Sequence, residues 1–153
     1  MPEAFEDSYL VETAPLLGVR ESRRIKGEYT LTVEDYFARR SFSDEIARNS
    51  YWLDCHPSGK NKSSFKPNPE DGYKKGDSHG IPFRCLIPQS VDNLLVAGRC
   101  ISVERIVLAS TRVMPNCLAT GEAAGVGASL SIKKNTEIHN IDGADVQKYI
   151  DNN

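Results

Sequence analysis

The sequence contains no long apolar run, and this absence limits the kinds of protein that it can encode. Its 153 residues include no stretch of about 18 consecutive apolar residues, which is the length that a membrane-spanning helix needs. The first residues, Met-Pro-Glu-Ala-Phe-Glu-Asp, are acidic, whereas a secretory signal is basic and then apolar. We therefore expect a cytoplasmic chain without a membrane partner, unless a missing N-terminal part carries a signal.

An excess of charge of either sign is also lacking. Lysine and arginine together number 19 and aspartate and glutamate 21, so the formal net charge is -2. A chain with this balance has no broad positive field that would attract a polyanion. We expect no nucleic-acid partner.

Cysteine is scarce and widely spaced. The four cysteines are Cys55, Cys85, Cys100 and Cys117, and no two of them form a Cys-x-x-Cys pair. This spacing favours neither a metal site nor a disulfide framework. Cys55 and His56 are neighbours in a predicted strand, where adjacent side chains point to opposite faces, so they would not form a catalytic Cys/His pair.

Residues 93–134 are the most informative stretch. Residues 94–97 are apolar and lie between an Asp92-Asn93 turn signal and Gly98, a pattern that predicts a strand buried on both faces of a parallel sheet. Apolar and small residues then recur at helical spacing from Pro115 to residue 134, and Asn135 is a possible left-handed C-cap.

The predicted helix has no acidic side chain in its first turn, residues 115–118. Its unpaired N–H groups and the positive end of its dipole therefore need an oxygen atom or an anion from elsewhere. A strand, a glycine turn and a helix directed at an anion are the parts of a nucleotide or cofactor site.

Five motifs in order resemble one family of enzymes. They are Leu-Gly-Val-Arg-Glu-Ser-Arg-Arg-Ile (17–25), Asp-Cys-His (54–56), Ile-Pro-Phe-Arg-Cys-Leu-Ile-Pro (81–88), Leu-Leu-Val-Ala-Gly-Arg-Cys-Ile-Ser (94–102) and Arg-Val-Met-Pro-Asn-Cys-Leu-Ala-Thr-Gly-Glu-Ala-Ala-Gly (112–125). Together they resemble the C-terminal portion of bacterial FAD-dependent oxidoreductases of the glutathione-reductase-like superfamily. One departure is large, because the Gly-x-Gly-x-x-Gly turn that holds the FAD pyrophosphate in such enzymes has no match here. We therefore expect the C-terminal part of a larger flavoprotein.

The resemblance implies roles for particular residues. Contacts to FAD are expected from Gly98, Arg99, Val113, Met114, Asn116, Cys117 and Leu118. Arg112 and His56 are expected to be catalytic, Arg112 by binding substrate or polarising the flavin and His56 as a general base or an orienting donor near the ring. Arg20, Arg23 and Arg84 are expected to bind the substrate or its carboxylate, with Arg24 as a further candidate.

Each of these roles has a plainer alternative. The arginines around residue 20 could form a solvated turn, Arg84 could serve only in a salt bridge, and His56 could be a satisfied polar residue at the end of a strand. The unit built from residues 94–97 and the following helix could also pack without any ligand.

The expected fold is α/β (mixed α+β), a partial FAD-binding domain, made of a closing strand and a helix, with part of a substrate-side domain. The expected parts are an N-terminal tail (1–16), a substrate-side portion (17–88) with a long loop (57–80), a strand-turn-helix unit (89–135) and a C-terminal tail (136–153) with a short helix capped by Asp142. Within them the patterns predict strands at 25–31, 51–56 and 81–88, and short helices at 33–40, capped by Thr32, and at 45–48, capped by residues 43–45.

The sequence thus predicts part of an oxidoreductase that takes a hydride from a small organic substrate. The isolated chain should bind FAD weakly or not at all, and it should associate with a missing N-terminal FAD-domain portion or with itself through exposed sheet edges. The alternative is a noncatalytic fragment or interaction module that does not bind FAD. Hydrolase chemistry from Cys117 or Ser110 near His56 lacks a nucleophile-elbow pattern.

This interpretation makes two structural demands. Residues 94–97 must lie in a sheet beneath the helix, and the N-terminus of the helix must not be closed by the chain's own side chains.

Overall fold

The computed structural model describes residues 6–55 and 72–152, in which four α-helices accompany one two-stranded antiparallel sheet. The α-helices are α1 (Val33–Phe37), α2 (Arg105–Thr111), α3 (Met114–Lys134) and α4 (Gly143–Asp151). The strands are β1 (Glu45–Asn49) and β2 (His79–Pro82), and short 3-10 helices are η3 (Phe83–Leu86), η4 (Gly98–Cys100) and η5 (Ile138–Asn140). The expectation of mixed helices and strands is confirmed.

The helix boundaries follow local capping chemistry. The Thr32 hydroxyl accepts a hydrogen bond from the backbone N–H of Asp35, and the Asp35 carboxylate accepts one from Thr32 N–H, so α1 begins with a capping box. Thr32 is the cap that the sequence predicts, but the helix ends at Phe37 rather than at residue 40. Asp142 caps α4 through Ala144 N–H at 2.9 Å. Asn135 ends α3 in the left-handed conformation, with φ 48° and ψ 51°.

The predicted helix at 45–48 is wrong, because these residues form β1. The register pairs Glu45 with Pro82, Ala47 with Ile81 and Asn49 with His79. Pairing with a strand thirty or more residues away in the sequence overrides the local helix signal. Asp44 therefore does not cap a helix, and its carboxylate accepts hydrogen bonds from Arg84 instead.

The predicted strand at 94–97 is also wrong, and so is the closing strand of the expected FAD-binding domain. These residues lie outside the sheet, Leu94 is 42 % exposed, and Val96 N–H donates to the Leu86 carbonyl at 2.9 Å. A strand needs a neighbour that takes up its N–H and C=O groups along its length. Within the described residues, the bond from Val96 to Leu86 is an isolated one, so no ladder of backbone hydrogen bonds forms along residues 94–97.

The other predicted strands are either shorter than expected or absent. Residues 25–31 contribute two isolated bridges, Gly27 to Pro88 and Leu31 to Val103, and residues 51–55 have no regular structure. In the segment 81–88, β2 ends at Pro82 and η3 follows. Most of the predicted loop at 57–80 lies outside the described residues, and its end forms the start of β2.

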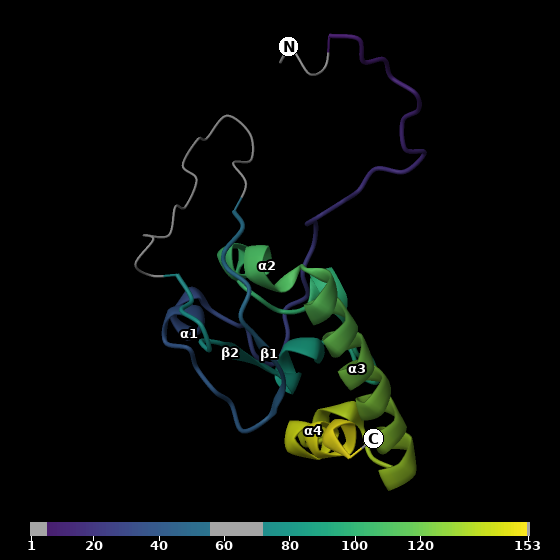
Figure 1. Ribbon diagram of the computed structural model, residues 1–153. Coiled ribbons are helices and arrows are strands. Elements are labelled where there is room, and N and C mark those ends of the chain that lie inside the picture. The colour runs from purple at the N-terminus through teal and green to yellow at the C-terminus, as the bar shows by residue number, and fades with distance from the viewer. Residues whose placement is uncertain (1–5, 56–71, 153) are drawn as a thin grey trace.

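Helix α3 lies along one side of the molecule, with α2 at its N-terminal end and α4 beside its C-terminal end (Figure 1). The Phe83 side chain of η3 is fully buried and packs against Gly127, where an added Cβ would lie 2.6 Å from the ring. This contact holds the middle of α3 close to the core. The long helix thus presents its N-terminus at the junction with α2.

Candidate functional site

The N-terminus of α3 is held in place by its junction with α2. Helix α2 ends at Thr111, Arg112 is its C-cap, and Val113 is already the N-cap of α3. Asn116 Nδ2 donates to the Ser110 carbonyl at 3.2 Å, and Asn49 Nδ2 of β1 donates to Ser110 Oγ at 2.7 Å. Because these groups are buried, the hydrogen bonds fix the direction in which α3 begins.

This N-terminus is open. No side chain caps it, its first turn carries no acidic residue, and Pro115 lies in that turn without an N–H to satisfy. Met114 and Leu118 are each 75 % exposed. Within the described residues, no side-chain hydrogen bond caps the helix N-terminus, whereas the demand for a strand at 94–97 is not met.

Helix η4 lies against the first turns of α3. Gly98 has a φ of +76°, which favours glycine, and its N–H donates to Thr120 Oγ1 at 3.0 Å. A Cβ at Gly98 would lie 3.8 Å from the Cys117 sulfur. Sequence reasoning missed Thr120, since it lies 22 residues from its partner and no local pattern connects the two.

The Arg99 side chain links distant parts of the chain by donating hydrogen bonds to two backbone carbonyl oxygens. Its Nη1 donates to the Val19 carbonyl at 2.9 Å and its Nε to the Arg112 carbonyl at 3.4 Å. The structure therefore brings together Gly98, Arg99, Arg112 and Cys117, which are four of the predicted site residues, beside Val113, Met114, Asn116 and Leu118 of the same turn.

Arg112 is 8 % exposed, and its guanidinium is paired. Nη1 donates to Glu21 Oε2 at 3.1 Å, and Nη2 donates to the Asp54 carbonyl at 2.8 Å, with Asp54 Oδ2 at 3.9 Å. Sequence reasoning did not identify Glu21 and Asp54 as its partners, because they lie 91 and 58 residues away. The Arg112 guanidinium thus holds a positive charge beside the α2–α3 junction, and the Glu21 carboxylate largely neutralises it.

The other predicted arginines are placed differently. Arg24 Nε donates to the Val103 carbonyl at 2.9 Å, and Arg20 and Arg23 are exposed. Arg84 makes a bidentate pair with Asp44 at 2.8 and 3.1 Å. It lines a separate cavity with Glu28, His139 and Gly143 of α4, so the structure does not bring it to the α3 N-terminus. His56 lies outside the described residues.

Cys117 is a poor candidate for a nucleophile. Burial raises the pKa of its thiol, and the opposing effect of the Arg99 guanidinium is smaller. Burial likewise raises the pKa of Cys55, with Arg112 opposing it. Both thiols are therefore expected to stay protonated at neutral pH, which gives the hydrolase alternative no support.

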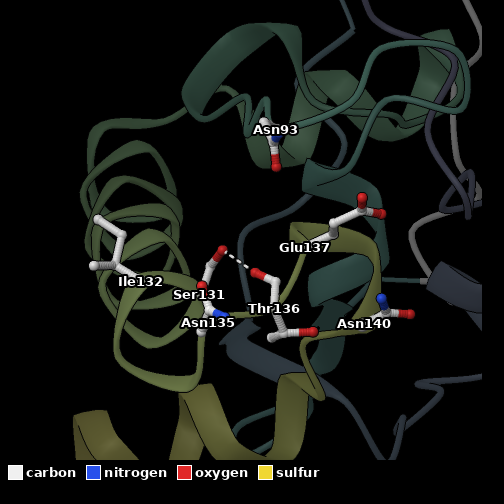
Figure 2. A pocket seen from close by; sticks show the side chains of 7 residues that line it. All are labelled: Asn93, Ser131, Ile132, Asn135, Thr136, Glu137 and Asn140. Atoms are coloured by element: carbon white, nitrogen blue, oxygen red, sulfur yellow. Dashed lines mark hydrogen bonds between the residues drawn. The ribbon is translucent and has the colours of Figure 1, made fainter.

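A polar cavity of about 560 Å³ lies at the other end of α3. It is lined by Asn93, Ser131, Ile132, Asn135, Thr136, Glu137 and Asn140. Figure 2 shows the Ser131 hydroxyl bonded to the Thr136 carbonyl, at 2.5 Å, and the Ile132 side chain extending away from the other six. None of the predicted site residues lines this cavity.

Two other kinds of site are absent from the described residues. Residues 6–55 and 72–152 contain no group of three or more His, Cys, Asp or Glu side chains that could hold a metal ion. In the same ranges, no helix is both long enough and apolar enough to cross a membrane.

A family model described as FAD dependent oxidoreductase matches residues 1–150. The comparisons with curated proteins and with solved structures gave no significant match.

Proposed function

The chain belongs to the FAD-dependent oxidoreductase family, and from this we propose that it supplies the flavin-ring side of an FAD site in an enzyme that takes a hydride from an organic substrate. The observation that carries the proposal is the open N-terminus of α3, which is a 21-residue helix with no acid in its first turn. It lies within a segment matched by the family model.

The chain's own contribution would be electrostatic. A bound flavin accepts the hydride and gains negative charge at the pyrimidine edge of its ring. The backbone N–H groups of Met114 and Asn116 and the positive end of the α3 dipole would stabilise that charge without reorganising. Removing one such donor from an enzyme typically costs a few kcal/mol of transition-state stabilisation.

The described residues fit the ring end of FAD better than its phosphate end. Gly98 approaches Cys117 without a side chain of its own, and no carboxylate lies in the first turn to repel an electron-rich ring edge. In contrast, none of the eleven glycines stands in a Gly-x-Gly-x-x-Gly turn, so this sequence offers no cradle of that kind for the pyrophosphate. We therefore propose that the chain by itself binds FAD only weakly, through the ring end alone.

The proposed role of Arg112 needs an exchange of partners. Its guanidinium is engaged by Glu21 and the Asp54 carbonyl, so a substrate carboxylate would have to replace Glu21 in order to bind bidentately. Arg20 and Arg23 stay proposals for substrate contacts. The Asp44 pair of Arg84 favours the salt-bridge role that the sequence left open.

A titration with riboflavin tests the proposal directly, because riboflavin carries the ring without the pyrophosphate. Backbone amide NMR signals of Met114, Asn116 and Cys117 should shift on addition of riboflavin. Met114→Glu should weaken the binding, since it puts a carboxylate at the helix N-terminus, and Ile132→Glu at the far end of α3 is the matched exposed control. An acid at this end favours the helix, so lost binding would not reflect unfolding. Signals that do not shift, or that shift only elsewhere, would contradict the proposal.

A noncatalytic interaction module is the second candidate. The observation that favours it is the exposed apolar side of α3, which includes Met114, Leu118 and Ile132. The same titration separates the two candidates, because an interaction module has no reason to recognise riboflavin at the α3 N-terminus.

A further inference from the structure

The polar cavity at the C-terminal end of α3, which we call the α3 end cavity, lies apart from the proposed flavin site. Its walls come from the loop at Asn93, from the last turn of α3 and from residues 135–140. Its volume of about 560 Å³ is within the range of small-molecule sites. All of its lining residues except Ile132 are polar, so hydrogen bonds and charge would hold a ligand there.

Contacts with the core hold the walls of the α3 end cavity in place. In the loop wall, Leu95 lies against α3, where an added Cβ on Gly127 would be 3.3 Å from the Leu95 Cδ1 atom. In the opposite wall, Ile138 is 5 % exposed. The Ser131 hydroxyl donates to the Thr136 carbonyl at 2.5 Å and fixes the turn that follows α3. The cavity is therefore preformed, and a ligand would need to order little of the chain.

Four side chains in these walls have hydrogen-bonding groups to offer. In the part of the chain that the structure describes, no hydrogen bond or ion pair engages the side chains of Asn93, Asn135, Asn140 and Glu137. Figure 2 shows the Asn93 side chain facing the gap from the loop and the Glu137 carboxylate on the opposite side. An asparagine amide both donates and accepts, so the three amides match the hydroxyl groups of a ligand.

The charge around the α3 end cavity favours a cation. Glu137 is the only ionisable residue in the lining, and the C-terminal end of the α3 dipole is negative. The two lysines of the last turn are engaged by α4. Lys134 pairs with Asp145, and Lys133 Nζ lies 5.0 Å from the centre of the Tyr149 ring. The lining itself therefore contains no cation that would neutralise Glu137.

We propose that the α3 end cavity binds a small organic cation that carries an ammonium group and several hydroxyl groups. The ammonium group would pair with the Glu137 carboxylate, and the hydroxyl groups would exchange hydrogen bonds with the three asparagine amides. His139 and Asp92 adjoin the cavity and offset each other, with Nε2 and Oδ1 3.7 Å apart. A metal ion fits less well, because Ca²⁺ takes several oxygen ligands at short distance and the lining supplies a single carboxylate. Binding at this cavity does not depend on flavin.

An NMR titration with two sugars tests the proposal. Glucosamine carries several hydroxyl groups, and its amine is protonated at about pH 6. It should shift the side-chain amide signals of Asn93, Asn135 and Asn140, with a dissociation constant on the order of 1 mM. Glucose has a hydroxyl in place of the ammonium group and should bind at least about fivefold more weakly. Amide signals that do not shift, or equal affinities for the two sugars, would overturn the proposal.

Three substitutions make the test specific for this cavity. Glu137→Gln should weaken glucosamine binding by at least about fivefold and leave glucose binding unchanged. Glu122→Gln is the matched control, because it removes the same charge from an exposed position in the middle of α3. Asn93→Gly should weaken the binding of both sugars, and glycine accepts the φ of 53° at this position without strain. Equal effects of Glu137→Gln and Glu122→Gln would show that only the net charge of the chain matters, which would also overturn the proposal.

Discussion

Asn49 and Ser110 lie 61 residues apart in the sequence, and the Asn49 side-chain amide donates to the Ser110 hydroxyl at 2.7 Å inside the core. Asn49 belongs to β1 and Ser110 to α2. Asn116 of α3 donates to the carbonyl of the same serine. One residue of α2 therefore connects the sheet with the helix that carries the candidate site.

Asn49→Ala should reduce the free energy of unfolding by about 1–3 kcal/mol, because it leaves buried polar groups of Ser110 without this partner. Urea unfolding followed by circular dichroism measures the change. Ser50→Ala, at the exposed neighbouring position, should change the free energy by less than about 0.5 kcal/mol. Equal effects of the two substitutions would show that the hydrogen bond contributes little.

Arg84→Ala should destabilise the fold by about 1 kcal/mol, since it leaves the mostly buried carboxylate of Asp44 without its cation. The figure is modest because the Arg84 side chain is 45 % exposed, and solvent screens the pair. Arg23→Ala, at an exposed position, is the control and should have a negligible effect. If Arg84→Ala instead impaired riboflavin binding and left stability intact, the salt-bridge role would be wrong.

His79 should make the fold less stable as the pH falls. Its side chain is fully buried and hydrogen-bonded to the Tyr73 hydroxyl. Burial, with Arg48 and Arg39 adding to it, lowers the pKa of His79 from 6.5 to about 4. Between these two values the unfolded chain binds a proton that the folded chain does not bind. The free energy of unfolding should therefore fall by up to about 1.4 kcal/mol per pH unit from pH 6.5 towards pH 4.

Chemical unfolding of His79→Phe over this range should show a flatter dependence on pH. His139→Gln is an informative comparison, because the hydrogen bond to Glu28 raises the pKa of His139. The stability that His139 provides is present below its unfolded pKa and is lost as the pH rises through its raised folded pKa. The His139→Gln variant should still lose stability as the pH falls from 6.5 towards 4. If His79→Phe lost as much stability over this range as the unmodified chain, the loss would belong to groups other than His79.

Gly127→Ala and Gly121→Ala should change thermal stability in opposite directions, although both lie within α3. At Gly127 the new methyl group would lie 2.6 Å from the Phe83 ring, and such overpacking costs about 1–3 kcal/mol. At Gly121 it meets nothing within 4 Å, so the better helix propensity of alanine should add up to about 1 kcal/mol. Combining Gly127→Ala with Phe83→Leu should recover part of the loss, and a stabilising Gly127→Ala would contradict the packing described here.

The sequence predicted those parts of the fold whose causes lie within a few residues. Thr32, Asp142 and Asn135 act on backbone groups two to four residues away, so the ends of α1, α3 and α4 could be recognised from local chemistry. The strand at 94–97 and the helix at 45–48 failed because their structure depends on distant partners. Whether a backbone segment pairs, and with what, is settled by tertiary contacts.

The candidate site likewise has features that follow from neighbouring residues and features that depend on distant ones. The open helix N-terminus was recognisable from the missing acids and from Pro115. The partners of Arg112 were not, since Glu21 and Asp54 reach it only through the fold. Arg84 was expected to bind an anionic ligand, whereas it is engaged by a carboxylate that the sequence assigned to a helix cap.

Only Val113 separates the C-cap of α2 from the first residue of α3. A connection this short cannot absorb a large change in direction, so α3 cannot tilt without moving α2, which β1 holds through Ser110. The start of α3 is therefore held in one direction before any ligand arrives, so binding there would sacrifice little conformational entropy.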